Sequence, residues 1–168
     1  GWYHYQATIG QNEMRSPANG DVMVVSVAPE SGEPNWSRST RGSGANYGYD
    51  ISADMRGGLY LTGIFHDRID FSGLELESRG GSDIFIARYD LNGNQDWVHG
   101  FGGPNDDRAH GIASDSRNGN VAVAGYFEGQ ASYHGKADTR VISDEGDREI
   151  LLLYLDRNGN PLWSQVEG

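Results

Sequence analysis

Apolar and polar residues alternate along this chain in short runs, and the runs are separated by turns rich in glycine, asparagine and aspartate. Such alternation, carried by β-branched and aromatic residues, predicts β-strands. No segment shows the apolar spacing of an amphipathic helix of three turns. We therefore expect a protein that is almost entirely β.

The pattern repeats about every sixty residues. The segment Asp83–Trp97 aligns with Glu149–Trp163, so that an apolar run, an Asp-x-Asn-Gly-Asn turn and a tryptophan fall in register. A more diverged copy runs from Val22 to Trp36, and the three tryptophans are spaced by 61 and 66 residues. Self-similarity at a fixed period indicates a repeat architecture.

Each complete repeat predicts four short strands. The predicted strands are Tyr49–Asp54 and His110–Asp115, Leu59–Phe65 and Val121–Phe127, Ile84–Tyr89 and Ile150–Leu155, and the fourth strands around Trp97 and Trp163. A four-stranded antiparallel unit repeated at this period is the signature of a β-propeller blade. A β-sandwich would show cleaner alternation and no such period, so we rank it lower.

The ends of the chain fall within this repeat. Gly1 aligns with Gly63 and Gly125, which places the start on a second strand, and the chain ends after a fourth strand. The predicted fold is all-β, with about two and three-quarter four-stranded antiparallel blades of an incomplete propeller. We expect one segment with a partial blade at 1–41 and blades at 42–103 and 104–168. A closed propeller needs about four to eight blades, so further blades in the same chain or oligomerisation would complete it.

Composition narrows the possible partners. Glycine makes up 25 of 168 residues, about twice the usual share, and it clusters with turn formers. A net charge of −11 argues against nucleic acid as a partner. No apolar run reaches the length of a membrane span, so no membrane insertion is expected. The absence of cysteine excludes disulfides and thiol catalysis.

Several motifs resemble a known family. They are Gly48–Asp54, Leu59–Gly63, Gly80–Asp90, Asn92–Asn94 and Phe101–Gly103. Together they resemble the SBBP-type bacterial β-propeller repeat, and the likeness covers essentially the whole chain. The resemblance implies a module of a secreted or cell-surface bacterial protein and supplies no common catalytic set. We therefore expect a non-enzymatic segment without a cofactor, acting in structural assembly, adhesion or binding of a protein partner.

Candidate binding residues lie on two kinds of connection. The connections Phe65–Ser82 and Phe127–Arg148 differ strongly between repeats, which favours recognition. In a propeller they emerge on the same face as the links between blades. The candidate ligand or partner residues are His66, Asp67, Arg68, Asp106, Asp107, Arg108, His110 and Glu128. The link equivalent to 106–108 carries Asn46 and Tyr47, so its charge is not required by the fold, and a solvated loop is the favoured alternative.

The Asp-x-Asn-Gly-Asn turns have two interpretations. Alternate oxygen side chains are typical of calcium loops, but the glycine stands at the fourth position and no bidentate glutamate follows. Asp, Asn and Gly are also the preferred residues of a hairpin turn, and we favour this interpretation. The weak calcium candidates are Asp90, Asn92, Asn94, Asp156, Asn158 and Asn160. By the same turn chemistry, we expect Asp54 and Asp115 to accept hydrogen bonds from the backbone of the turn that follows.

A second function class remains open. A carbohydrate- or polymer-binding or polymer-active propeller would use exposed, clustered aromatic rings as sugar platforms. The candidates are Trp2, Tyr3, Tyr5, Tyr47 and Tyr126. Most of them stand at strand positions, where aromatic residues are usually core.

Overall fold

The computed structural model describes residues 1–16, 20–134, 141–142 and 148–167, and these residues form strands and turns without a helix. None of the described part is therefore a helix able to cross a bilayer. The strands are β1 (Trp2–Tyr3), β2 (Gln6–Ile9), β3 (Asn12–Arg15), β4 (Asp21–Val27), β5 (Pro34–Ser39), β6 (Arg41–Gly42), β7 (Tyr47–Ala53), β8 (Leu59–Asp70), β9 (Glu75–Tyr89), β10 (Gln95–Gly102), β11 (Arg108–Ser114), β12 (Val121–Glu128), β13 (Gln130–Tyr133), β14 (Val141–Ile142), β15 (Arg148–Leu155) and β16 (Pro161–Glu167).

Antiparallel pairing groups the main strands into three units. The first unit contains β1, β4 and β5 in that order. In the second unit β7 pairs with β8, β8 with β9, and β9 with β10. The third unit has the order β11-β12-β15-β16. The expected all-β fold and the predicted strands of both complete repeats are confirmed.

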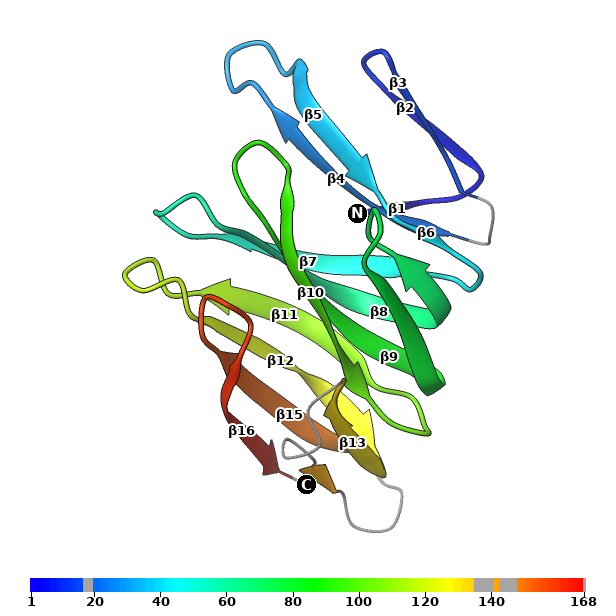
Figure 1. Ribbon diagram of the computed structural model, residues 1–168, viewed down its shortest axis with the longest axis vertical. Coiled ribbons are helices and arrows are strands. Elements are labelled where there is room, and N and C mark those ends of the chain that lie inside the picture. The colour runs from blue at the N-terminus through cyan, green and yellow to red at the C-terminus, as the bar shows by residue number, and fades with distance from the viewer. Residues whose placement is uncertain (17–19, 135–140, 143–147, 168) are drawn as a thin grey trace.

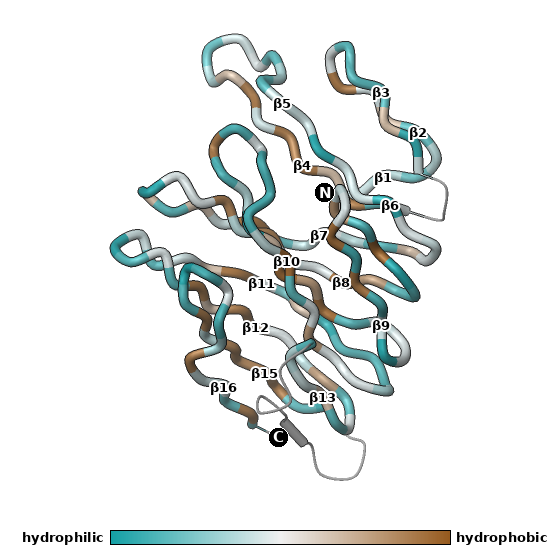
Figure 2. Tube along the Cα trace, in the orientation of Figure 1, coloured by the Kyte–Doolittle hydropathy of each residue, from teal (hydrophilic) through white to brown (hydrophobic). Residues whose placement is uncertain are grey.

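The units follow one another along the long axis of the molecule, with the first unit at the top of Figure 1 and the third at the bottom. Apolar residues concentrate in strands such as β4, β12 and β15, and the turns at their ends are hydrophilic (Figure 2). One buried cluster joins the first and second units through residues such as Val24 and Phe85. A second cluster joins the second and third units through Ile86 and Leu153. The core therefore lies between units.

The connection between the second and third strands of a unit, expected to be a loop, itself forms β-strands. In the second unit β8 and β9 continue past the sheet as a hairpin, paired from Arg68↔Glu77 to Asp70↔Glu75. In the first unit the corresponding segment forms the hairpin β2–β3. In the third unit it contributes β13, and the charged residues at 135–140 and 143–147 lie outside the described residues.

These hairpins also pair with the preceding unit. Arg41 of β6 pairs with Asp70 of β8, and at the next boundary Gly102 of β10 pairs with Ser132 of β13. The fourth strand of one unit is thus extended into hydrogen-bonding contact with the hairpin of the next. The same link occurs at both boundaries, so neighbouring units share backbone pairing as well as apolar contacts.

Candidate functional site

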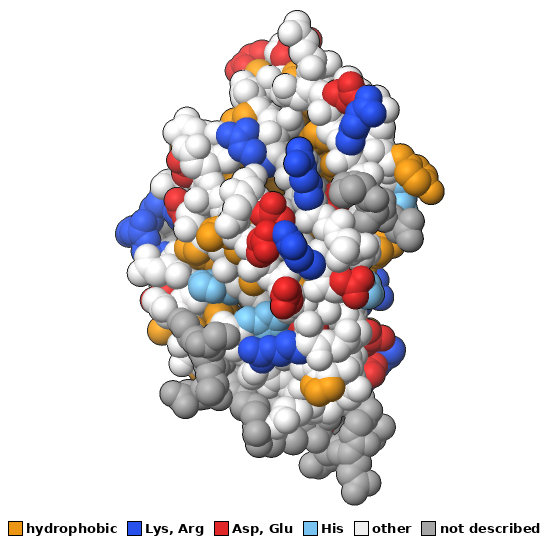
Figure 3. Space-filling view, turned by 45° about the vertical axis from the view of Figure 1, so that its right-hand side comes forward, with side chains coloured by type: hydrophobic (Ala, Val, Ile, Leu, Met, Phe, Trp, Pro, Cys, Tyr) orange, Lys and Arg blue, Asp and Glu red, His pale blue; other side chains and the backbone are white. Residues whose placement is uncertain are grey.

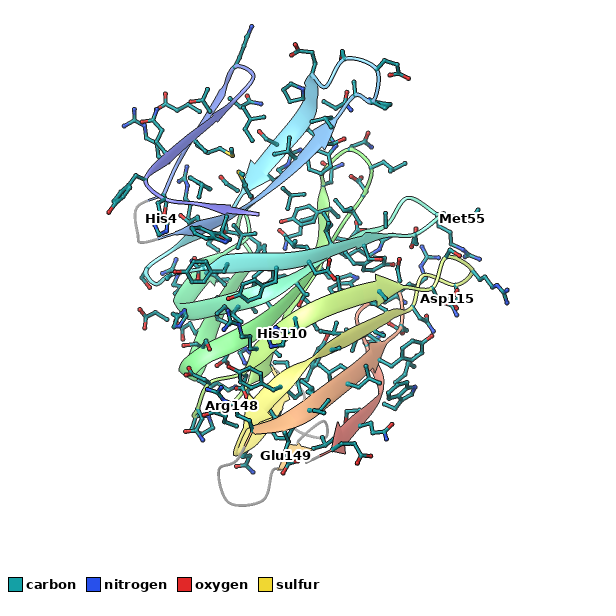
Figure 4. The ribbon with its side chains drawn as sticks, turned by 180° about the vertical axis from the view of Figure 1, so that it is seen from behind. His4, Met55, His110, Asp115, Arg148 and Glu149 are labelled. Carbon is teal, nitrogen blue, oxygen red and sulfur yellow. The ribbon has the colours of Figure 1, made fainter. Side chains whose placement is uncertain are left out.

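The links between units open on one side of the molecule. Figure 4 shows His4, His110 and Arg148 along this side, while the turns that carry Met55 and Asp115 lie on the opposite side. We call this side the link face. It holds six of the eight candidate residues, described in turn below: the four of the link and β11, together with Glu128 at the end of β12 and His66.

Asp106 acts as a backbone cap in the link before β11. Its Oδ1 atom accepts hydrogen bonds from the Ser82 backbone N–H at 2.9 Å and from the Ser82 hydroxyl at 3.2 Å. The backbone hydrogen bond, with smaller contributions from the nearby His66 and Arg148 charges, lowers the pKa of the Asp106 carboxyl. Asp106 itself is exposed, as expected for a solvated link.

Asp107 does not fit the expectation of a solvated loop, because its side chain is fully buried. Its Oδ2 atom accepts the Gly103 N–H at 2.7 Å, and Oδ1 accepts the Glu128 N–H at 3.3 Å. Burial, together with the neighbouring Asp83 charge, raises the pKa of Asp107 to about 7. The link folds inward here because two backbone N–H groups need an acceptor beneath the surface.

Asp83 forms the other half of this buried carboxyl pair. A Cβ atom at Gly102 would lie 2.4 Å from Asp83 Cγ and 2.8 Å from Asp107 Oδ2, so only glycine fits between them. The His134 ring nitrogen Nε2 lies 2.8 Å from Asp83 Oδ2. Within the described residues, Asp83 Oδ1 is buried without a hydrogen-bond partner. The pair is held inside the boundary between the second and third units.

The preceding boundary has the same arrangement with one less charge. Asp21 stands where Asp83 does, and Asn46 stands where Asp107 does; both are fully buried. Asn46 Nδ2 donates to Asp21 Oδ1 at 3.3 Å, and Thr40 donates to the same oxygen at 3.5 Å. Burial raises the pKa of Asp21 despite these hydrogen bonds. An amide and a carboxyl thus serve the same structural position in successive units.

The remaining link residues bring arginine next to tyrosine. The Arg108 guanidinium lies 4.7 Å from the Tyr49 ring centroid, and Arg148 lies 4.8 Å from that of Tyr126. Arg148 also forms an ion pair with Glu128. His110 is exposed, and its ring centroid is 5.7 Å from that of Tyr126. This part of the link face combines aromatic rings with cationic groups.

The three consecutive candidates at the base of the second unit's hairpin have different surroundings. His66 lies at the link face and donates from Nδ1 to the Ala45 carbonyl at 2.7 Å. Asp67 follows it with a φ of 54°, and Arg68 forms an exposed ion pair with Glu75 across the hairpin. His66 therefore has a packing role between link and strand, whereas Asp67 and Arg68 are surface residues of the hairpin.

The Asp-x-Asn-Gly-Asn turns use their oxygens internally. Asp90 Oδ1 accepts the N–H groups of Asn92 and Asn94, each at 2.8 Å, and Oδ2 accepts the Asn94 side-chain amide at 2.9 Å. Asp156 makes the same three contacts with Asn158 and Asn160. A calcium ion would have to compete with these hydrogen bonds. The turn interpretation accounts for every oxygen of both aspartates.

The expected caps at the other turns are also present. Asp54 Oδ1 accepts the N–H groups of Arg56 at 2.8 Å and Gly58 at 2.7 Å. In the next unit Asp115 Oδ1 accepts the Arg117 N–H at 2.9 Å. These repeated aspartates terminate the first strand of a unit by the turn chemistry predicted from the sequence.

The predicted aromatic platforms separate into exposed and buried rings. Trp2 is 44% and Tyr5 74% exposed, whereas Tyr3 is only 6% exposed and belongs to the core. The Trp2 and Tyr47 rings meet edge to face at 5.0 Å. Tyr126 is half-buried under Arg148. The start of the chain therefore has exposed aromatic rings, but Tyr3 is not one of them.

Charges of both signs are mixed over the surface. On the face shown in Figure 3, acidic and basic side chains alternate down the middle, and no large patch of one sign covers it. Within the described residues, no three His, Asp or Glu side chains are grouped so as to hold a metal ion.

Sequence reasoning missed three residues of this site: Asp83, His134 and Arg148. For Asp83 a signal existed, because Asp21 and Asp83 precede the third strand at the same repeat position. His134 and Arg148 carry no such signal, since the connection that bears them differs in sequence from its counterparts in the other units. No protein-family model matches this chain, and the search of curated proteins gave no match.

Proposed function

We propose that the three units are blades of an incomplete β-propeller of the SBBP-type repeat, and that the chain is a non-enzymatic module that works by binding protein surfaces. The proposal is supported by the four-stranded antiparallel units, their repeated backbone links and the apolar cores between them. The sequence resemblance favours a secreted or cell-surface role in assembly or adhesion.

The observation that carries the proposal is an apolar face in the third unit. Ile84 of β9 is fully buried against the third unit, while Ile150, at the same position of β15, is 65% exposed. On β16, the Leu162 side chain is 52% exposed and the Trp163 side chain is 47% exposed. We call Ile150, Leu162 and Trp163 the open face. Large apolar side chains left exposed on one face of a sheet mark an interaction site.

The carboxyl groups of the link face support binding over catalysis. Asp83 and Asp107 are fully buried, so a substrate would not reach them. Asp106 is exposed, but its Oδ1 atom accepts hydrogen bonds from the Ser82 backbone N–H and hydroxyl. General acid–base catalysis needs a carboxyl that is both accessible and free to exchange a proton.

Extending the chain by one repeat tests the blade proposal. A second copy of residues 103–168 joined directly after Gly168 would place a fourth unit on the open face. If the units are blades, the extended protein unfolds in one transition at a higher temperature, because a further apolar boundary becomes buried. Two separate transitions, or an unchanged midpoint, would contradict the proposal.

The exposed aromatic group supports carbohydrate binding as a second candidate function. Trp2, Tyr47 and Tyr49 form a row, with ring centroids 5.0 Å and 6.4 Å apart. Such rings can stack on the apolar faces of sugars. Binding of soluble polysaccharides should then be lost in Trp2→Ala and kept in Trp163→Ala, as measured by affinity electrophoresis. Equal migration of all three proteins with every polysaccharide would remove this candidate.

A further inference from the structure

Both internal boundaries are closed by the same contact between a tryptophan and a glycine turn. The Trp36 indole N–H donates to the Leu91 carbonyl at 2.8 Å, and a Cβ atom at Gly93 would lie 2.7 Å from the Trp36 ring. Trp97 donates to the Arg157 carbonyl at 3.1 Å, and a Cβ at Gly159 would lie 3.0 Å from its ring. The turn of each unit therefore sits directly on the tryptophan of the unit before it.

The third tryptophan exposes half of such a contact. Trp163 is 47% exposed and stacks on Tyr154 of its own unit, with ring centroids 5.1 Å apart. The described residues place no glycine turn over its ring: the two Asp-x-Asn-Gly-Asn turns sit on Trp36 and Trp97. Trp163 thus offers the surface that Trp36 and Trp97 offer to the next turn.

The first unit exposes the complementary half. Gly32 occupies the turn position of Gly93 and Gly159, and a Cβ atom there would have no neighbour within 4 Å. Its φ of 72° matches the 75° and 78° of the other two glycines. Gly32 N–H donates to the Ala28 carbonyl, four residues before it, at 2.8 Å, whereas Gly93 N–H donates to the Asp90 carbonyl, three residues before it, at 3.0 Å. The first turn is therefore one residue longer, but its glycine keeps the same positive φ and an uncovered surface.

Exposed apolar side chains lie beside both the Trp163 ring and the Gly32 turn. On the third unit they are the other residues of the open face. On the first unit, Val27 of β4 is 52% exposed, although Tyr89 at the same position of the second unit is only 5% exposed. The boundary between units occurs twice inside the molecule. The third unit exposes the tryptophan side of such a boundary, and the first unit exposes the glycine-turn side.

We propose that the open face binds the turn 28–33 of a second copy of this chain, so that the molecules associate head to tail. The Trp163 indole N–H would donate to the Pro29 carbonyl, which holds the position of Leu91 and Arg157, and the ring would lie under Gly32. The inference rests on the proposed packing of the units as blades. Because the two surfaces differ, the association is heterologous and forms a ring or a filament.

Two single variants and a control test the proposal by sedimentation velocity over a concentration series. Wild type should sediment faster as its concentration rises. Trp163→Ala removes the ring, and Gly32→Asn covers the turn with a side chain while tolerating the positive φ. Each should raise the dissociation constant about 30-fold or more, as for a tryptophan central to an interface. Met55→Ala is the control: this apolar side chain is 86% exposed in a turn outside the two proposed surfaces, so its loss should leave association unchanged.

Mixing the two variants tests the head-to-tail geometry itself. A Trp163→Ala chain keeps an intact turn and a Gly32→Asn chain keeps an intact open face, so an equimolar mixture should restore a complex that stops at two chains. Circular dichroism melts of each variant at low concentration verify that both fold. A mixture that stays monomeric, or variants that associate as wild type does, would overturn the proposal.

The outcome can be separated from that of the blade proposal. Wild type that remains monomeric throughout the series overturns binding of a second copy. If the extended chain with a fourth unit nevertheless melts as one more stable body, the blade packing stands and only the identity of the occupant is wrong.

Discussion

Asp107 and Asn46 occupy the same place in successive units, and they differ only in charge and in the proton they can carry. Both are fully buried beside an aspartate, Asp83 in one case and Asp21 in the other. Asn46 donates a hydrogen bond to its partner. Burial disfavours the ionised form of Asp107, and the neighbouring Asp83 charge adds to this effect, so the pKa of Asp107 is raised.

Replacing Asp107 by asparagine should therefore make the stability of the protein less dependent on pH. The folded-state pKa of about 7 lies above the ordinary value of 3.8, so the folded protein takes up a proton between these values. The contribution of Asp107 to the unfolding free energy falls as pH rises through this window, by about 3 kcal/mol between pH 5 and pH 8. Urea denaturation at the two pH values should show that Asp107→Asn lacks this fall.

The neighbouring carboxyl provides the matched control for this prediction. Asp106 is exposed and its pKa is lowered, so Asp106→Asn should keep the decline in stability between pH 5 and pH 8. Comparing each variant with wild type at both pH values cancels the contributions that the three proteins share. An Asp107→Asn variant that keeps the fall in stability between pH 5 and pH 8 would show that the Asp107 carboxyl does not titrate in this window.

At the scale of elements, each second strand bends at one left-handed residue before its hairpin begins. Tyr5, Asp67 and Gly129 have φ values of 60°, 54° and 70° and stand at equivalent repeat positions. In the second unit the pairing of β8 with β9 shifts register at this point, between His66 and Arg68. The bulge turns the hairpin away from the sheet and toward the preceding unit.

Asp67→Gly should stabilise the protein by roughly 0.5–1 kcal/mol, because glycine adopts a positive φ without the strain of a side chain. The third unit already uses glycine at this position. Thermal melts of Asp67→Gly should show a raised midpoint, and Asp70→Gly, at a paired residue of the same hairpin, should show a lowered one. A loss of stability in Asp67→Gly would indicate that the Asp67 side chain makes a favourable contact.

At the scale of the whole molecule, the tryptophans differ in how many units they connect. Trp36 and Trp97 each contact the turn of the next unit, whereas Trp163 stacks on Tyr154 of its own unit and no turn among the described residues covers it. Cooperative unfolding in a repeat protein depends on such boundaries. The boundary tryptophans should therefore matter far more to stability than the third.

Trp97→Ala should lower the unfolding free energy by about 2–4 kcal/mol, since the half-buried ring and its hydrogen bond are both lost. Trp163→Ala should cost less than about 1 kcal/mol in dilute solution, where the ring remains partly in water. Urea denaturation at low protein concentration measures both. Similar losses in the two variants would mean that the boundary contact contributes little.

The strand order and its period could be predicted from the sequence because each strand is a local pattern. Alternating residues such as those of Leu59–Phe65, and turn formers such as Asp90 and Gly93, act over a few positions. The caps at Asp54 and Asp90 followed from the same local chemistry. Comparing repeats also showed that the charge at 106–108 is not needed by the fold.

The burial of Asp107 and the exposure of Trp163 depended on the tertiary structure. Asp107 is buried because distant groups, the N–H of Gly103 and that of Glu128, converge on its carboxylate. Trp163 follows the same Asp-x-Asn-Gly-Asn turn as Trp97, yet its surroundings differ because the described residues include no unit that covers it. A sequence pattern determines hydrogen bonds within a strand or turn, whereas contacts between units depend on which surfaces are brought together in space.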